Sequence, residues 1–277
     1  MIPKKIHYCW FGKQPLPENM KSFIATWHNM CPDYEIIRWD ESNFDVNKSI
    51  PFVREAYSHK KYAFVSDYVR LLALYKEGGI YIDTDVEIVK PLDIFLNNRF
   101  FTSVEYIEDN VRVLNVKKRL NPDGTKKHKD DIIIGIGIVS AFFGAEAKHP
   151  YILDCIKFYE RKHFVLPDGN FYDKVILTVI MALCAEKYGF KYIDGEQELD
   201  EGLHIFPRDY FTHVGSRSER SVALHMAYNS WRGKSFFVDL YCQLGKIKVL
   251  KKLKSTMMGI PFVRLVLDKI RKYIWFR

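Results

Sequence analysis

The sequence lacks paired cysteine motifs, a leader-like apolar start and any apolar run long enough to cross a membrane. Its five cysteines, at positions 9, 31, 155, 184 and 242, are odd in number and include no Cys-x-x-Cys pair. This pattern argues against a disulfide framework or a zinc ribbon and fits a reducing compartment. The longest nearly unbroken apolar run, residues 132–145, is too short to span a bilayer. We therefore expect a cytoplasmic protein, either soluble or peripheral on the inner face of the plasma membrane.

The sequence also contains no internal repeat and no low-complexity linker. A length of 277 residues with 48% hydrophobic content supports a sizeable core. We expect one domain over residues 1–240, followed by a basic tail over residues 241–277. Of the net charge of +8, residues 244–277 contribute +9, so the rest of the chain carries −1. Since the basicity belongs to the tail, the sequence argues against a nucleic-acid binder.

The tail alternates lysine clusters with apolar residues and ends in Trp275 and Phe276. Helical spacing of this kind, basic on one face and apolar on the other, predicts an amphipathic helix that lies on an anionic membrane surface. The alternative is a pair of helices that packs on its own domain. We favour membrane contact because the charge excess is so local.

The first forty residues read as a strand, a helix and a second strand, at residues 6–11, 18–30 and 34–40. This order is typical of the start of an α/β sheet. Trp10 falls at the carboxyl end of the first strand, where ligands of open α/β sheets bind. Its ring could stack on a nucleobase or simply belong to the core.

The pattern over residues 60–77 predicts a helix that is apolar around most of its circumference. Asp67 and Arg70 interrupt this pattern at positions i and i+3, so they share one face. Buried charges need a partner, and these two either pair with each other or hold a ligand. Gly78 and Gly79 then end the helix and release the chain into a strand.

That strand leads directly into Asp83 and Asp85. Alternate side chains of an extended chain point the same way, so we expect the two carboxylates to project together. Two neighbouring carboxylates raise each other's pKa unless a cation or a hydrogen-bond network lies between them. Mg²⁺ or Mn²⁺ suits such a pair and leaves coordination positions for a substrate phosphate. Acids at a solvated strand end are the plainer alternative.

The later chain predicts strands at residues 99–106 and 132–143 and helices at 150–162 and 175–188. Between the strands, residues 111–134 suggest a two-stranded excursion around the turn 121–124, either an acceptor-side lid or a plain surface loop. A last strand ends at His225, with Ser230 and Trp231 just beyond it. This loop could offer a metal-binding imidazole, a hydroxyl and an indole donor, although a histidine such as His225, taken alone, is more often structural than a metal ligand.

Four motifs, at residues 2–12, 66–70, 78–85 and 225–231, together resemble the DXD-containing sugar transferases of glycosyltransferase family 32. That family includes bacterial capsular polysaccharide and O-antigen enzymes of lipopolysaccharide biosynthesis and yeast mannosyltransferases, and it is distantly similar to clostridial glucosylating toxin domains. The resemblance implies a GT-A fold, a central mixed sheet flanked by helices. It also implies a nucleotide-sugar donor, for which we expect UDP, a divalent cation (Mn²⁺ or Mg²⁺) and retention of anomeric configuration. The acceptor would be a polysaccharide or lipid-linked oligosaccharide.

The resemblance implies roles for the donor-side residues. Trp10 would stack on the nucleobase, while Asp67 and Arg70 would hold ribose and sugar hydroxyls. Asp83 would contact ribose and sugar and could touch the ion.

It also implies roles at the metal and the diphosphate. Asp85 would be the dedicated metal ligand, His225 would complete the metal site, and Ser230 and Trp231 would lie near the diphosphate. The sequence departs from the family at residues 170–174, where many relatives carry a Gly-Pro step. Contacts from that loop are therefore open.

The sequence also allows two alternatives to a sugar transferase. Residues 82–86 superficially fit the aspartyl nucleophile loop of a haloacid-dehalogenase-type phosphatase, but such loops usually lie near the N-terminus. A non-catalytic membrane-associated scaffold with the same fold is the second rival. The set of candidate metal and donor residues argues against it.

Overall fold

The computed structural model describes residues 1–227. The predicted domain boundary at residue 240, the Ser230 and Trp231 pair and the predicted tail at residues 241–277 lie outside the described residues. The domain division therefore stays a prediction.

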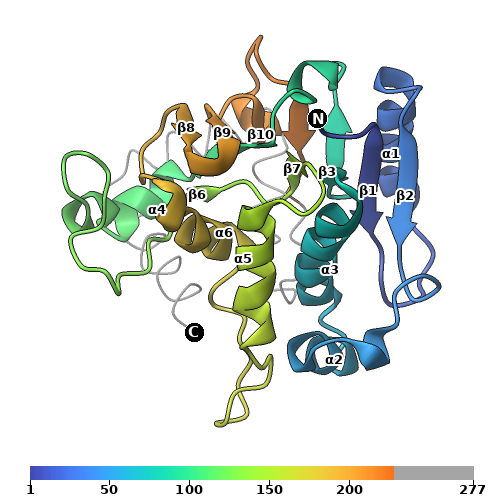
Figure 1. Ribbon diagram of the computed structural model, residues 1–277, viewed down its shortest axis with the longest axis horizontal. Coiled ribbons are helices and arrows are strands. Elements are labelled where there is room, and N and C mark those ends of the chain that lie inside the picture. Colours follow the sequence, from blue (N-terminus) through green and yellow to red (C-terminus); the bar gives the residue numbers. More distant parts are fainter. Residues whose placement is uncertain (228–277) are drawn as a thin grey trace, which may run out of the picture. The chain divides into compact units, whose positions relative to one another are not determined.

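An eight-stranded mixed sheet forms the centre of the described chain (Figure 1). Its order is β2-β1-β3-β7-β5-β9-β8, and β6 pairs with β5. The strands are β1 (Lys5–Cys9), β2 (Glu35–Trp39), β3 (Gly79–Ile82), β5 (Phe100–Tyr106), β6 (Ile136–Ile138), β7 (Phe142–Ala145), β8 (Gln197–Leu199) and β9 (Leu203–Phe206). Because β7 is antiparallel to both β3 and β5, those two strands end at the same edge of the sheet, as does β1, which is parallel to β3.

A second, three-stranded sheet has the order β10-β11-β4. Its strands are β10 (Phe211–His213), β11 (Ala223–His225) and β4 (Val86–Ile88). The helices are α1 (Glu18–Met30), α2 (Pro51–Ser58), α3 (Tyr62–Glu77), α4 (Glu108–Val113), α5 (Pro150–Glu160) and α6 (Leu177–Ala185). The expected α/β class, a mixed sheet flanked by helices, is confirmed.

The small sheet and α1 share one core with the main sheet. Trp27 of α1 is fully buried and donates its indole N–H to the carbonyl of Val86 in β4 at 2.8 Å. Phe142 of β7 and Phe211 of β10 pack with their ring centroids 4.3 Å apart. These contacts hold β4 beside β3, so the short link between the two strands occupies a fixed place.

Two glycines connect α3 to β3. Gly78 ends the helix at a φ of +67°, and its amide donates to the carbonyl of Leu74 at 2.8 Å. Gly79 has a φ of +113°, and a Cβ there would lie 2.8 Å from the carbonyl oxygen of Lys5 in β1. Only glycine lets β3 enter the sheet this close to β1.

The predicted strand at residues 132–143 is wrong as a single element. The chain forms β6 and β7 separately, because β6 pairs with the end of β5 whereas β7 pairs with its start and with β3. Between them, the carbonyls of Val139 and Ser140 accept hydrogen bonds from the side chains of Thr102 and Arg70. The link is thus held by these side chains together with single backbone bonds, such as the one from the amide of Val139 to the carbonyl of Ser103 at 2.9 Å, and not by a continuous strand ladder.

The predicted two-stranded excursion at residues 111–134 is also wrong. Its first part is helical, in α4 and a 3₁₀ helix (Val116–Arg119), and only the isolated bridge between Leu120 and Lys126 remains of the pairing. Glu108 and Asp109 in the first turn of α4 favour the helix through its dipole. The turn itself is present, because the amide of Gly124 donates to the carbonyl of Asn121 at 3.0 Å.

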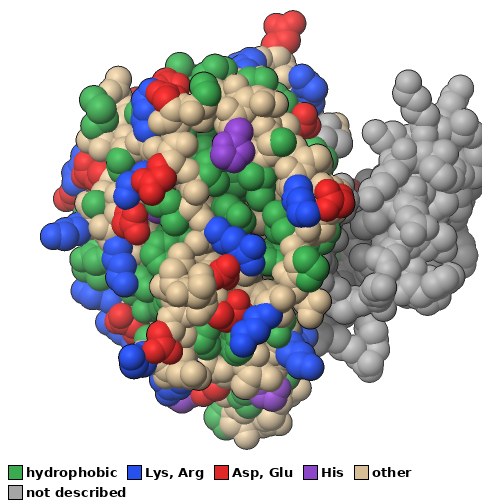
Figure 2. Space-filling model, turned by 90° about the vertical axis from the view of Figure 1, so that its right-hand side faces the viewer, with side chains coloured by type: hydrophobic (Ala, Val, Ile, Leu, Met, Phe, Trp, Pro, Cys, Tyr) green, Lys and Arg blue, Asp and Glu red, His purple; other side chains and the backbone are tan. Residues whose placement is uncertain are grey.

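Within residues 1–227, none of the helices combines the length and the apolar character that a membrane crossing requires. Cys9, Cys31, Cys155 and Cys184 are free thiols. Figure 2 shows one face of the protein, on which hydrophobic side chains are interspersed with charged ones of both signs.

Candidate functional site

Asp83 and Asp85 converge through a turn that joins the two sheets. β3 ends at Ile82, the amide of Val86 donates to the carbonyl of Asp83 at 3.0 Å, and β4 then begins. The amide of Asp83 is itself held by the carbonyl of Ala141 at 2.8 Å. The sequence predicted that the two side chains project together, which they do, but for a different reason. A tight turn brings them together, and not the alternation of an extended strand.

His225 reaches this turn because β11 pairs with β4. In the antiparallel register His225 lies opposite Val86, and the amide of Met226 donates to the carbonyl of Asp85 at 2.9 Å. The imidazole Nε2 consequently lies 3.2 Å from Oδ1 of Asp85. Residues far apart in the sequence thus meet through one strand pairing.

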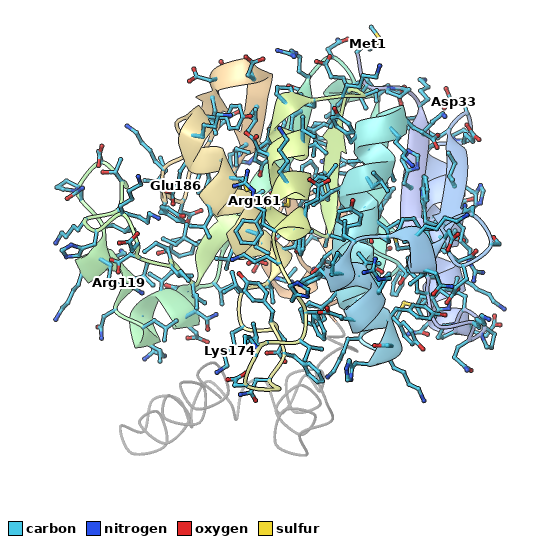
Figure 3. All side chains as sticks on the ribbon, turned by 60° about the horizontal axis from the view of Figure 1, so that its bottom comes forward. Met1, Asp33, Arg119, Arg161, Lys174 and Glu186 are labelled. Carbon is cyan, nitrogen blue, oxygen red and sulfur yellow. The ribbon has the colours of Figure 1, made fainter. Side chains whose placement is uncertain are left out.

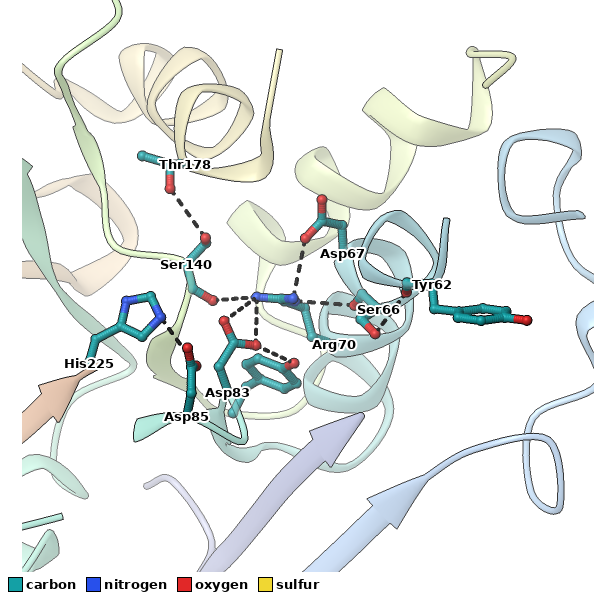
Figure 4. A network of polar contacts seen from close by, with 10 residues as sticks. Tyr62, Ser66, Asp67, Arg70, Asp83, Asp85, Ser140, Thr178 and His225 are labelled. Carbon is teal, nitrogen blue, oxygen red and sulfur yellow. Dashed lines mark hydrogen bonds and ion pairs between the residues drawn. The ribbon is translucent and has the colours of Figure 1, made fainter. Parts of the chain in front are cut away.

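The potential ligand atoms of Asp83, Asp85 and His225 all lie within 4.8 Å of one another (Figure 4). Two carboxylates and one imidazole are a donor set that suits Mn²⁺ and related divalent ions, and all three side chains are partly accessible. The residues present therefore fit a divalent cation. A ligating imidazole must be neutral, so a bound cation would replace the present contact between His225 and Asp85.

Beside this cluster, the guanidinium of Arg70 is the centre of a buried polar network (Figure 4). It lies 3.3 Å from Oδ1 of Asp67 and 3.3 Å from Oδ1 of Asp83. It also donates to the backbone carbonyls of Ser66 at 3.2 Å and Ser140 at 2.8 Å. The side chain is only 6% exposed. Asp67 and Arg70 pair on one face of α3, and Arg70 links that pair to the acid turn.

Tyr81 belongs to this network and was missed by sequence reasoning. Its hydroxyl donates to Oδ1 of Asp83 at 2.8 Å, and the guanidinium of Arg70 lies over its ring, 4.4 Å from the centroid. Tyr81 precedes Asp83 by two residues at the end of a strand, so alternation could have indicated that they share a face. Ser140 and Thr178 also belong to this network, since their hydroxyls lie 3.2 Å apart. No sequence pattern indicates that these two residues lie near Arg70.

Burial sets the proton affinities of this site. It raises the pKa of Asp67 to about 6, although Arg70 acts in the opposite direction. Burial also raises the pKa of Asp83, where Arg70 again opposes and Asp85 adds to the increase. For Arg70, burial disfavours the charge, but Asp83, Tyr81 and Asp67 outweigh it and raise its pKa, so the guanidinium stays charged. For His225, the bond to Asp85 outweighs burial and raises the pKa.

Trp10 lies at the same edge of the sheet as the acid turn. It directly follows β1, whose His7 is paired with Tyr81 in β3, and its side chain is partly exposed. The indole N–H donates to the carbonyl of Gln14 at 2.7 Å. The ring is therefore not part of the fully buried core. Ser230 and Trp231 lie outside the described residues, so their places at the site stay predictions.

Taken together, these features describe a mixed α/β domain in which two acids, Asp83 and Asp85, directly follow a central strand of the sheet. Part of the chain is also similar to a known protein family. Residues 17–101 match the family described as "Glycosyltransferase sugar-binding region containing DXD motif". The matched region contains Asp67, Arg70, Asp83 and Asp85. The resemblance to DXD-containing glycosyltransferases is confirmed, whereas the narrower assignment to family 32 stays a prediction.

Curated relatives align with parts of the chain. Inositol phosphoceramide mannosyltransferase 3 of Schizosaccharomyces pombe is 35% identical over 99 residues, which are 35% of this chain and 28% of that protein. The initiation-specific alpha-1,6-mannosyltransferase of Candida albicans is 28% identical over 106 residues, covering 35% of this chain and 28% of that protein. The alignments thus span less than a third of the length of these relatives.

Among solved structures, the PaToxG glycosyltransferase has a TM-score of 0.40 and 16% identity, and the match covers 67% of this chain and 68% of that one.

Proposed function

We propose that this chain is a metal-dependent, retaining glycosyltransferase of the GT-A type. It would move a sugar from a nucleotide-sugar donor to a hydroxyl of a polysaccharide or lipid-linked oligosaccharide. The observation that carries the proposal is the convergence of Asp83, Asp85 and His225 beside the Arg70 network. The family match over the segment that contains both acids supports it.

Asp83, Asp85 and His225 would hold the divalent cation, with Asp85 as its most dedicated ligand. When bound, the cation supplies positive charge that stabilises the departing diphosphate of the donor. Asp83 has a second task, because its carboxylate is also shared with Arg70 and Tyr81. That sharing makes Asp83 the link between the cation and the donor sugar.

The Arg70 network would orient the donor. Two backbone carbonyls fix the guanidinium, so it holds the carboxylates of Asp67 and Asp83 in a set orientation toward ribose and sugar hydroxyls. Trp10, at the same sheet edge, would stack on the nucleobase. Ser230 and Trp231 would complete the diphosphate site.

We favour attack of the acceptor from the face that the diphosphate leaves. The bond from the anomeric carbon to the phosphate oxygen breaks, the acceptor oxygen bonds to that carbon on the same face, and the departing phosphate takes the hydroxyl proton. We favour this route because each acid of the site already contacts Arg70 or belongs to the candidate metal cluster. None of them is therefore available as a covalent nucleophile. Mass spectrometry of enzyme trapped during turnover tests this, because a glycosylated Asp or Glu on the pathway would exclude it.

The proposed donor is a sugar attached to a nucleoside diphosphate. We propose UDP as the nucleotide. GDP-mannose is the main competitor, since two of the aligned relatives are named as mannosyltransferases.

A screen of nucleotide sugars with Mn²⁺ or Mg²⁺ tests the function directly. We expect one donor to raise the melting temperature and to be hydrolysed slowly in a cation-dependent manner, because ligand binding stabilises the folded state by mass action. Asp85→Ala should abolish the hydrolysis. If no nucleotide sugar binds or is cleaved, the proposal is wrong.

The same screen separates the rivals. A phosphatase would release phosphate from an aryl phosphate without any nucleotide sugar. A non-catalytic scaffold would not hydrolyse the donor, and Asp85→Ala would leave its other properties unchanged. The family match favours neither.

The tail would bring the enzyme to the anionic inner face of the plasma membrane, where lipid-linked acceptors lie. Deletion of residues 246–277 should then reduce binding to anionic liposomes. Unchanged binding would contradict this role of the tail.

A further inference from the structure

The long connection between β5 and β6, residues 107–135, has a fixed surface. Its tip is docked on the segment that follows α6: the amide of Tyr192 donates to the carbonyl of Gly124 at 2.8 Å, and Lys126 pairs with Glu186 at 2.8 Å. Lys126 is only 7% exposed in this pair. Arg119, labelled in Figure 3, pairs with Asp131 at 2.7 Å. The connection is therefore folded onto the domain.

This docking leaves an excess of positive charge on the outside. Residues 116–131 contain six Lys and Arg and three acids, Asp123, Asp130 and Asp131. The internal pairs use Lys126 and Arg119. The remaining cations, Lys117, Lys118, Lys127 and Lys129, are exposed and form no ion pair with any residue in the described range 1–227.

One exposed isoleucine lies on the connection, and a second lies where the tip of the connection docks. Ile132 is 39% exposed and Ile193 is 36% exposed, and they are among only five large hydrophobic residues that are exposed in the described chain. The carbonyl of Ile132 accepts a bond from Arg119 at 3.1 Å, which places it beside the 3₁₀ helix that carries Lys117 and Lys118. Ile193 contacts the backbone at Gly124 in the docked tip.

We propose that these six residues, Lys117, Lys118, Lys127, Lys129, Ile132 and Ile193, form a membrane-contact surface that binds anionic lipid headgroups. Unpaired lysines attract the negative surface of a bilayer, and each contributes about 1 kcal/mol near it. The apolar side chains favour a bilayer over a soluble polyanion, because only the bilayer offers them an apolar environment. We call these residues the connection surface.

The connection surface is attached to the rim of the candidate site. The connection leaves the main sheet after Tyr106 of β5 and returns through β6, which leads to Ser140 and hence to Arg70. Contact of this surface with a membrane would orient the site relative to the bilayer. This contact is distinct from the one proposed for the tail and does not depend on catalysis.

Sedimentation of the full-length protein with vesicles tests the proposal. The probes are phosphatidylcholine vesicles with and without about 30% phosphatidylglycerol, at a low salt concentration of about 0.05 M so that charge effects are not screened. For Lys127→Gln/Lys129→Gln we expect partitioning onto the anionic vesicles to fall about 30-fold, as two charges at about 1 kcal/mol each predict. Ile132→Ser should weaken binding by a smaller factor without changing its salt dependence.

The matched control is Lys76→Gln/Lys157→Gln, which removes two exposed lysines from α3 and α5. It should keep wild-type binding. The proposal is overturned if the two double variants lose binding equally, if neither loses any, or if the wild type binds vesicles with and without phosphatidylglycerol equally well. Melting temperatures within about 2 °C of wild type would show that the exposed substitutions leave the fold intact.

Discussion

The two halves of the candidate site are built in opposite ways. The charged residues of the Arg70 half come from α3 and the end of β3, which are adjacent in the sequence. The guanidinium has four partners, of which only the Ser140 carbonyl is distant in the sequence, and its side chain is 6% exposed. The His225 half joins distant parts of the chain through one strand pairing, and its imidazole is 26% exposed. The first half is held by several polar contacts and is largely shielded from solvent. The second keeps accessible ligand atoms for a cation.

Because the two halves differ in burial, substitutions in them should have different main effects, on the stability of the fold in one half and on enzymatic turnover in the other. Substitutions in the Arg70 half should mainly affect the free energy of unfolding, because they leave buried charges without partners. Substitutions in the His225 half should mainly affect cation-dependent activity. Four predictions test this contrast.

The largest stability effect is expected for Arg70→Met. Loss of the guanidinium leaves the carboxylate of Asp67, which is 13% exposed, and the partly buried carboxylate of Asp83 without their counter-charge, which should cost about 3–5 kcal/mol. Urea unfolding measures it. Arg38→Met is the control, since Arg38 pairs with Asp40 but is 39% exposed, and we expect less than about 1 kcal/mol. Equal losses would refute the contrast.

For Asp85→Ala the expected effect is on turnover. We expect cation-dependent activity to fall about 100- to 1,000-fold, because charge stabilisation of the leaving group is lost. Nucleotide binding, measured by calorimetry, should weaken much less. Glu87→Gln, two residues further along β4, serves as the control and should keep activity. A larger loss of nucleotide binding than of turnover would assign Asp85 to the donor side.

The pH dependence of stability should report on Asp67. Its pKa rises on folding from 3.8 to about 6, so the folded state binds this proton more tightly than the unfolded state. The protonated carboxyl therefore favours folding at low pH, and this contribution is lost as pH rises from about 4 to about 6. Relative to Asp67→Asn, wild type should lose up to about 2–3 kcal/mol over this interval. Parallel unfolding curves across the interval would contradict the raised pKa.

The smallest effect is expected for Tyr81→Phe, which removes the hydrogen bond to Asp83. A hydrogen bond to a carboxylate is worth about 1.5–3 kcal/mol when buried, and the partial exposure of Asp83 favours the lower end of this range. Tyr188→Phe is matched, because its hydroxyl donates to Asp154 at 2.7 Å away from the site. Both variants should lose similar stability, but only Tyr81→Phe should also weaken donor binding. If both leave donor binding unchanged, Tyr81 has only a structural role.

The sequence predicted the local parts of this site well. The helix at residues 18–30 has the expected bounds, and Asp67 and Arg70 pair across one helical turn, because periods of 3.6 residues are visible in a single segment. The acid pair was expected from its spacing. These features depend on residues that are close in the sequence.

Features that depend on distant pairing could not be predicted in the same way. The Asp83 to Val86 turn exists because β4 leaves the main sheet to pair with β11. No local pattern encodes that partner. The division of β6 from β7 has the same origin, since it depends on which part of β5 each strand pairs with.

The pairing of β4 with β11 also has a consequence for the order of folding. During synthesis, Asp83 and Asp85 leave the ribosome long before His225, and the contacts that hold the β1-β2-β3 part of the sheet are complete by then. Contacts between such distant segments form late because their loop-closure cost is high. The three potential ligands of the candidate metal site would therefore come together only after β11 has paired with β4.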